Sequence, residues 1–169
     1  QQHSKFREKI LAQRARRAWP VANVEFGYEH GPLGPEDKTY GKAHAPEEFV
    51  TRAWEVAMAG GYTAYYYTYT AWDVLRPDDE PKGYAYFQRL RTFFETTRHW
   101  ELAPADNVTS AGWALANPGR EYIVCLKPAA PFTLTVEALD TLTGEWFNPL
   151  TNERIAAGTI AAGSREMNP

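Results

Sequence analysis

The sequence has few of the residues and runs that mark several protein classes. Its 169 residues include one cysteine, Cys125, so no disulfide can form within the chain and the redox compartment stays open. No apolar run approaches the roughly 20 residues that a membrane-spanning helix needs, and no signal peptide is visible. The net charge is −3, and this lack of positive charge argues against nucleic acid. We therefore expect neither a membrane nor a nucleic acid among the partners.

Motifs that identify several enzyme classes are also missing. The chain has no phosphate-binding loop, dinucleotide-binding fingerprint, internal repeat or cysteine-rich metal spacing. His30 and His44 flank a loop, where they could bind substrate or a metal. Two lone histidines without nearby ligands are, however, more often ordinary polar residues. We expect no metal site, and His30 remains a candidate for contact with a substrate.

Aromatic residues, by contrast, are abundant. They make up 14% of the chain, with 6 Trp and 10 Tyr. Most of these rings should fill a core, although such rings also stack on sugars. With 44% hydrophobic and 23% charged residues, the chain should fold and bury a core.

The first hundred residues alternate between helical and strand-like patterns. The apolar periodicity predicts helices over 4–18, from Pro46 to about residue 59, and over 84–98, and strands over 21–26 and 62–72. The helix that starts at Pro46 should end at Gly60 and Gly61, and the last helix should turn Tyr84, Phe87, Leu90 and Phe94 inward. Strands that alternate with helices argue for parallel βαβ units.

Two strands cannot make an independent parallel sheet, because both faces and both edges need cover. A complete (β/α)8 barrel takes roughly 250 residues. Residues 1–103 therefore predict the C-terminal portion of such a barrel, with its last two strands and flanking helices. The expected partner is the missing set of N-terminal barrel strands, from the same parent chain or a second chain. The start at Gln1 rather than Met suggests a trimmed or excised piece.

The pattern changes after Pro104. Short β-like runs are separated by turn signals that contain Pro, Gly and Asn, and they cover 111–115, 121–126, 132–138 and 144–147. Regular short strands with such turns are typical of an all-β domain. Residues 104–169 therefore predict a small antiparallel β-sandwich.

Two carboxylates close to the end of the first predicted strand are the main candidates for chemistry. Barrel enzymes place their active sites at strand ends, and glycoside hydrolysis needs two carboxylates and water but no cofactor. Glu25 is the candidate nucleophile, with a structural ion pair to an arginine as the alternative. Gly27 should break the strand, so Glu29 should lie in the following loop and accept a hydrogen bond from a substrate hydroxyl or from Tyr28.

Aromatic residues near these carboxylates are candidates for substrate binding. Tyr28 could hydrogen-bond the nucleophile or simply pack against the loop. Trp72 ends the second predicted strand, where it could stack under a sugar ring or fill the core. Tyr65 and Tyr66 should point to opposite faces of that strand, one toward the helices and one toward the barrel interior. The sequence does not decide which.

Several short motifs together resemble the apiosidase-like glycoside hydrolases. Trp19-Pro20-Val21 running into Glu25 and Tyr28-Glu29 resembles the segment around the seventh barrel strand of that family. The other matching segments are Arg52-Ala53-Trp54 with Gly60-Gly61, the strand that ends in Trp72, Phe93-Phe94 with 100–104, and the turn at 146–152, where Asn148 and Asn152 replace the family's Asp and Gly. The resemblance covers almost the whole chain.

The resemblance implies a (β/α)8 barrel followed by a β-sandwich that is sometimes labelled as collagen-binding. It implies a glycosidase that acts on a side chain of a plant or microbial polysaccharide. The nucleophile of such barrels lies at the end of strand seven, which corresponds to Glu25. Their general acid lies at the end of strand four, and this chain departs from the family because it lacks strands one to six.

Two other function classes stay open at this point. The first is a carbohydrate- or protein-binding module without catalysis, in which Trp113 or Trp146 forms a platform and the glutamates are inert. The second is a structural fragment of a larger enzyme, which should expose an apolar sheet edge.

Overall fold

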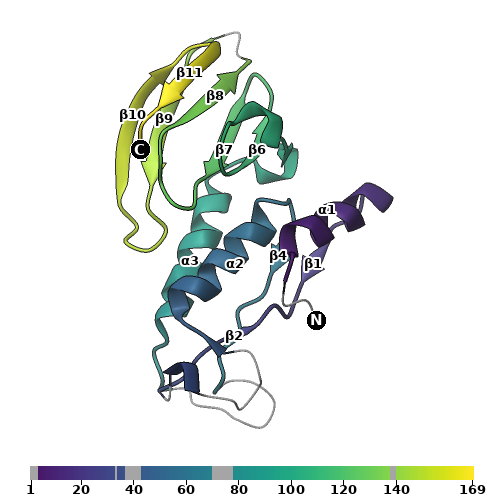
Figure 1. The fold of residues 1–169 in the computed structure, drawn as a ribbon, viewed down its shortest axis with the longest axis vertical. Helices are drawn as coiled ribbons and strands as arrows, with labels where there is room; N and C mark the ends of the chain where they lie inside the picture. The colour runs from purple at the N-terminus through teal and green to yellow at the C-terminus, as the bar shows by residue number, and fades with distance from the viewer. Residues whose placement is uncertain (1–3, 33, 37–42, 70–77, 138–139) are drawn as a thin grey trace. The chain divides into compact units, whose positions relative to one another are not determined.

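A computed structural model describes residues 4–32, 34–36, 43–69, 78–137 and 140–169. The chain divides into two compact units, residues 1–92 and 93–169, which are described separately below (Figure 1). The first unit is mixed α/β and the second is built from antiparallel strands. Among the described residues, no helix has the length and apolar character needed to cross a membrane.

The described residues of the first unit form parallel strand pairs, three α-helices and one 3-10 helix. Its elements are α1 (Phe6–Arg16), β1 (Ala22–Asn23), β2 (Tyr28–Glu29), the 3-10 helix η1 (Gly34–Glu36), β3 (Ala43–His44), α2 (Pro46–Ala57), β4 (Tyr62–Thr63) and α3 (Lys82–Glu95), whose last residues belong to the second unit. Strands β1 and β4 pair in parallel, with α2 between them in the sequence, and β2 pairs in parallel with β3. The predicted parallel βαβ arrangement is confirmed.

The strands are shorter than predicted. The run 21–26 forms a ladder only at Ala22 and Asn23, and the run 62–72 only at Tyr62 and Thr63. A separate parallel bridge joins Glu29 to Tyr67. The two chain segments therefore pair twice, with an irregular stretch between the pairings.

Helix α2 begins and ends where the sequence predicts. Pro46 occupies a favoured first position, and Glu47 and Glu48 lie in the first turn near the positive end of the helix dipole. The chain leaves the helix through Gly60, whose φ of +73° suits a residue without a Cβ. The buried side of α2 consists of Pro46, Phe49, Val50, Ala53, Trp54 and Val56.

The aromatic core of the first unit is centred on Phe26. This ring is fully buried and stacks on Phe49 of α2, with 4.9 Å between the ring centroids. Phe87 of α3 stacks on the same pair, and Phe6 of α1 meets Phe26 edge to face. One side chain thus joins the segment between β1 and β2 to all three helices.

Helix α3 confirms the predicted helix over 84–98, but one residue that was expected to turn inward does not. Leu90 is buried as expected, whereas Tyr84 is 56% exposed. The inward position in the first turn belongs to Gly83, which approaches the side chain of Glu29 too closely for any larger residue. The Tyr84 ring packs edge to face on Tyr65, with 5.9 Å between the ring centroids.

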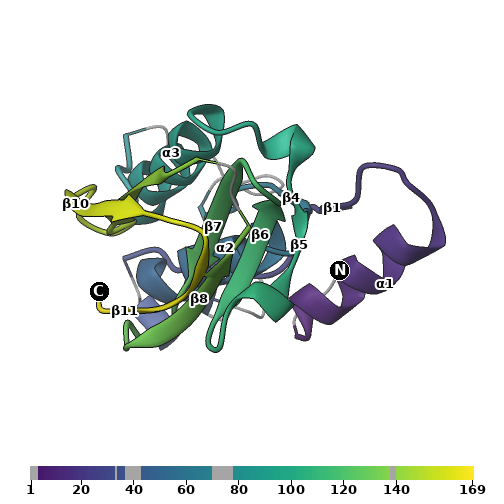
Figure 2. The same ribbon diagram turned by 90° about the horizontal axis from the view of Figure 1, so that it is seen from above.

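The second unit consists of short antiparallel strands and two 3-10 helices. The strands are β5 (Ala103–Pro104), β6 (Trp113–Asn117), β7 (Glu121–Cys125), β8 (Phe132–Val136), β9 (Leu142–Phe147), β10 (Arg154–Ile160) and β11 (Gly163–Met167), and the helices are η2 (His99–Glu101) and η3 (Asp106–Val108). They pair as β5-β6-β7, β8-β11 and β9-β10. Figure 2 shows β6 beside β7 and β8 beside β11.

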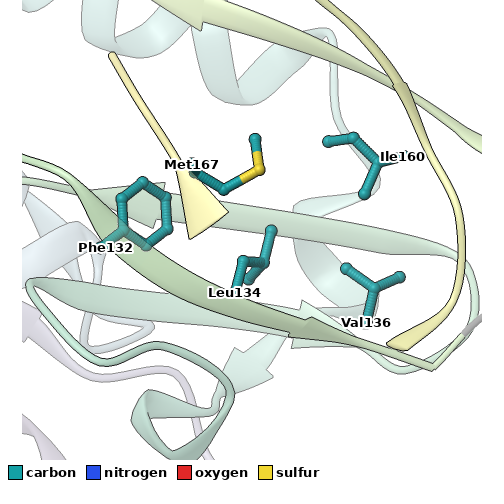
Figure 3. Packing of buried hydrophobic residues seen from close by; sticks show 5 residues of the cluster. All are labelled: Phe132, Leu134, Val136, Ile160 and Met167. Atoms are coloured by element: carbon teal, nitrogen blue, oxygen red, sulfur yellow. The ribbon is translucent and has the colours of Figure 1, made fainter. Parts of the chain in front are cut away.

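The core of this unit follows the alternation of β8. Phe132, Leu134 and Val136 are buried and the residues between them are exposed. Ile160 of β10 and Met167 of β11 complete the cluster (Figure 3). The four predicted strand regions are confirmed. The short strand β5 was not predicted, and neither were β10 and β11. Their alanine, glycine and charged residues have little β propensity, and pairing with β9 and β8 keeps them extended.

Candidate active site

The segment between β1 and β2 contains two extra residues. Asn23 pairs with Thr63 and Glu29 with Tyr67, so the chain advances six residues on one side and four on the other. Such insertions form β-bulges, which redirect side chains. Gly27 lies within the bulge with a φ of +126°.

The bulge corrects the predicted position of Glu29. Gly27 interrupts the strand, but pairing resumes at β2, so the expectation that Glu29 lies in a loop is wrong. The Glu29 amide donates to the Tyr66 carbonyl at 2.9 Å, and the Glu29 carbonyl accepts from the Thr68 amide at 3.0 Å. Both backbone groups of Glu29 therefore bind the neighbouring segment on either side of Tyr67.

The bulge also brings Glu25 and Tyr28 together. In a regular strand, residues three apart point to opposite faces. Here the Tyr28 hydroxyl donates to Oε1 of Glu25 at 2.5 Å. Tyr28 is buried, and its ring meets Tyr66 edge to face at 5.5 Å. Glu25 itself is half-buried, so its carboxylate is held on one side while remaining accessible.

The arginine partner considered for Glu25 is not what the structure shows. Within the described ranges, Glu25 makes no ion pair. Its partners are the Tyr28 hydroxyl and, through its own backbone amide, Oδ1 of Asn23 at 3.3 Å. Among the described residues, the Glu25 carboxylate therefore has a neutral donor beside it and no cation.

Glu29 points to the opposite face from Tyr28. Its Oε2 accepts a hydrogen bond from Tyr65 at 2.5 Å, and its Oε1 accepts from the Gly83 amide at 3.1 Å. Only 3% of Glu29 is exposed. Burial raises the pKa of Glu29, against the hydrogen bonds from Tyr65 and Gly83, which lower it. Both carboxylate oxygens thus bind within the protein, and a role in substrate binding stays a prediction.

The two faces of the tyrosine-rich segment can now be assigned. The Tyr65 ring packs against Phe49 of α2 and Phe87 of α3, so this face meets the helices. Tyr66 lies on the other face with Tyr28. Burial and the hydrogen bond to Glu29 both raise the pKa of Tyr65, which keeps its hydroxyl protonated as a donor. The candidate site therefore lies on the face that carries Glu25, Tyr28 and Tyr66.

The structure says less about the two other predicted substrate contacts, His30 and Trp72. His30 is half-buried, and its Nδ1 lies 3.1 Å from the Gly31 carbonyl oxygen. Trp72 lies outside the described residues. In the part of the chain that the structure describes, no three His, Cys, Asp or Glu side chains gather as a metal site.

Sequence reasoning missed the residues that hold the bulge. Arg52 of α2 donates from Nη1 to the Phe26 carbonyl at 3.2 Å. A Cβ on Gly27 would lie 2.8 Å from His44 Cδ2 and 3.3 Å from Arg52 Nη1. The available signal was Gly27 itself, a glycine between two candidate site residues, but the position of its partners required the fold.

Solved structures that are similar to this chain include two glycoside hydrolases. One is described as a glycoside hydrolase, with a TM-score of 0.74 and 16% sequence identity. The other is a glycoside hydrolase family 5 protein from Bacteroides vulgatus ATCC 8482, with a TM-score of 0.69 and 14% identity. Each match covers 96% of this chain but only 42% of the other chain. No family model and no curated protein matches the sequence.

At these identities the likeness concerns the fold. A mixed α/β part followed by antiparallel strands corresponds to part of the glycoside hydrolase structures. The chain spans less than half the length of either solved structure.

Proposed function

We propose that this chain is the C-terminal part of a retaining glycoside hydrolase and that Glu25 is its nucleophile. The observation that carries the proposal is the hydrogen bond from Tyr28 to Glu25 across the bulge, on the face that turns away from α2 and α3. The similarity of the fold to part of two glycoside hydrolase structures supports it.

The proposed reaction assigns one oxygen of Glu25 to each task. Oε1 accepts the bond from Tyr28 and fixes the carboxylate, whereas Oε2 accepts none among the described residues. Oε2 attacks the anomeric carbon, the glycosidic bond breaks, and a general acid protonates the leaving oxygen. The same acid group, now a base, then activates a water molecule that hydrolyses the glycosyl ester.

The general acid lies outside this chain. Retaining hydrolysis needs a second carboxyl group about 5–5.5 Å from the nucleophile, and Glu29 points to the other face of the strand, where Tyr65 and Gly83 bind it. The remaining barrel strands, from the same parent chain or a second chain, supply the acid in this proposal.

The free side of β1 provides a place for those strands. Among the described residues β1 pairs only with β4. A groove of about 350 Å³ lies between α1 and β1, where Phe6, Ile10 and Val21 line it. Val24, which also lines this groove, is 57% exposed. Lys9, Gln13 and Glu25 line the same groove, so it combines apolar with polar and charged side chains. An unpaired strand edge beside an exposed apolar side chain needs cover in a folded protein.

The proposed assignment of the two parts of the chain to known domain types follows from the sequence motifs. We assign residues 1–103 to the last two strands and flanking helices of a (β/α)8 barrel of the apiosidase-like type, and residues 104–169 to a β-sandwich. The substrate is a glycan, with Tyr28, His30 and Trp72 as the candidate contacts, whereas Glu29 is bound on the opposite face by Tyr65 and Gly83. The first unit would then contribute the nucleophile, which is one of the two carboxyl groups that the reaction needs.

The test replaces Glu25 in the protein that carries this chain together with the remaining barrel strands. Release of 4-nitrophenol from a panel of 4-nitrophenyl glycosides measures turnover. Glu25→Gln should lose about 1,000-fold or more of kcat, roughly 4 kcal/mol. Glu8→Gln, on the exposed side of α1, is the matched control and should keep full activity.

A chemical rescue separates the nucleophile from other roles. In Glu25→Ala, sodium azide should take the place of the carboxylate and give a glycosyl azide with the opposite anomeric configuration to the substrate. Retention of more than about a hundredth of the activity in Glu25→Gln would remove Glu25 from this role.

A further inference from the structure

We infer that Arg52 is a positioning residue for Glu25, and that it acts through the backbone of the bulge. The inference rests on the proposed function of Glu25. Arg52 lies on α2 and its guanidinium reaches the Phe26 carbonyl. This carbonyl belongs to the peptide bond between Phe26 and Gly27. Glu25 lies directly before these two residues and Tyr28 directly after them, so Arg52 binds the backbone between the two partners of the proposed site.

The guanidinium of Arg52 is held from two sides. Its Nη2 donates to Oε1 of Glu48 at 2.7 Å, and the same oxygen lies 3.2 Å from Nδ1 of His44. The planar group also lies 5.5 Å from the Phe6 ring centroid. An arginine fixed in this way can present Nη1 to a carbonyl in one orientation, which a flexible lysine does less well.

Glu48 stays ionised at the pH of most assays. Burial alone would raise its pKa, but the hydrogen bond from Arg52 and the charges of His44 and Arg52 lower it below its ordinary value. The ion pair that orients Arg52 therefore persists at neutral pH.

The bulge needs such a support. Its two extra residues interrupt the ladder between Asn23 and Glu29, and Arg52 supplies a charged donor to a carbonyl within the interruption. The side chain of Phe26 is anchored in the aromatic core on the helix side. Gly27 fits closely under His44 and Arg52, since a Cβ there would lie 2.8 Å from the histidine ring.

Loss of the contact between Arg52 and the Phe26 carbonyl would change the position of the proposed nucleophile, Glu25. The bond between Tyr28 and Glu25 depends on the backbone angles at the two residues between them. If the Phe26 carbonyl rotates, Tyr28 and Glu25 separate and the carboxylate loses its orientation. Misplacement of a reacting group by about 1 Å can cost on the order of 100-fold in rate.

The test compares Arg52→Met with Val56→Ala in the same complete protein. Val56 is a buried residue of α2, and a Cβ on Gly61 would touch both Val56 and Ile10 of α1. Arg52→Met should lower kcat on 4-nitrophenyl glycosides about 10- to 100-fold with KM changed less than about threefold. Val56→Ala should lower the unfolding midpoint and leave kcat unchanged while the protein is folded.

The decisive comparison is between the rate loss that Arg52→Met causes when Glu25 is present and the loss that it causes in Glu25→Ala. In Glu25→Ala with azide, the carboxylate is gone, so Arg52→Met should lower the azide reaction less than about threefold. An equal loss in both backgrounds would show that Arg52 supports the fold or the substrate site instead of Glu25, and would overturn the inference. If Arg52→Met does not fold, Arg52→Gln replaces it with the same expectations, because its amide ends about two bonds short of the position from which Nη1 of Arg52 reaches the Phe26 carbonyl.

The two proposals fail in different ways. An active Glu25→Gln variant contradicts the proposed function whatever Arg52 does. An inactive Glu25→Gln variant combined with an Arg52→Met variant that keeps its kcat contradicts only the positioning role.

Discussion

Replacing Gly83 with alanine gives the sharpest stability test of the first unit. Gly83 lies in the first turn of α3, where alanine would ordinarily stabilise a helix by up to about 1 kcal/mol. Here the added Cβ would lie 2.1 Å from Oε2 of Glu29 and 2.9 Å from its Cδ. Glu29 is 3% exposed, so its carboxylate has little room to move away.

The expected loss can be worked from these contacts. Overpacking of a dense site costs about 1–3 kcal/mol, and displacement of the carboxylate weakens its bonds from Tyr65 and the Gly83 amide, each worth about 1.5–3 kcal/mol when one partner is charged. Helix propensity offsets up to about 1 kcal/mol. Gly83→Ala should therefore lower the free energy of unfolding by about 2–4 kcal/mol.

The assay is a double-mutant cycle by urea unfolding. In Glu29→Ala the obstructing carboxylate is absent, so Gly83→Ala should be neutral or stabilising there by up to about 1 kcal/mol. The coupling between the two sites should be about 3 kcal/mol. A stabilising Gly83→Ala in the otherwise unchanged protein, or additivity within about 0.5 kcal/mol, would refute the packing argument.

Three further predictions concern the same strand. Tyr28→Phe removes the donor to Glu25 and should lower kcat about 10- to 100-fold with little change in stability; an unchanged kcat would contradict the role of this bond. Gly27→Ala combines a strained φ of +126° with a contact to His44 at 2.8 Å and should cost about 2 kcal/mol or more in urea unfolding. Burial raises the pKa of Glu29 above 4.5, so the folded state binds more protons than the unfolded chain between the two pKa values, and the free energy of unfolding should fall as the pH rises through that window. Glu29→Gln should remove this slope, and an identical slope in both proteins would exclude Glu29 as its source.

Local signals in the sequence predicted the helices well. Helix α2 has a proline at its start, acidic residues in its first turn and glycines at its end, and each acts within a few residues. Strands β10 and β11 lack such signals: β10 is extended through pairing with the preceding strand β9, and β11 through pairing with β8, which is not its neighbour in the sequence. Local propensity therefore could not find them.

In the candidate site, too, the sequence predicted features that depend on local signals and missed those that depend on packing. The residue types near Glu25 predicted carboxylate chemistry, and the period of a strand predicted that Tyr65 and Tyr66 face opposite ways. The period failed at the bulge, where two extra residues place Glu25 and Tyr28 on one face. The contribution of Arg52, 26 residues beyond Phe26, depends on the packing of α2 and has no local signature.

The central claim is that Glu25 forms a covalent ester with the sugar. The most direct measurement treats the complete protein with a panel of 2,4-dinitrophenyl 2-deoxy-2-fluoro-glycosides, whose fluorine slows breakdown of the ester, and then maps peptides by mass spectrometry. We expect one added fluoroglycosyl group on Glu25. An ester on another residue, or hydrolysis that inverts the anomeric configuration without any ester, would contradict it.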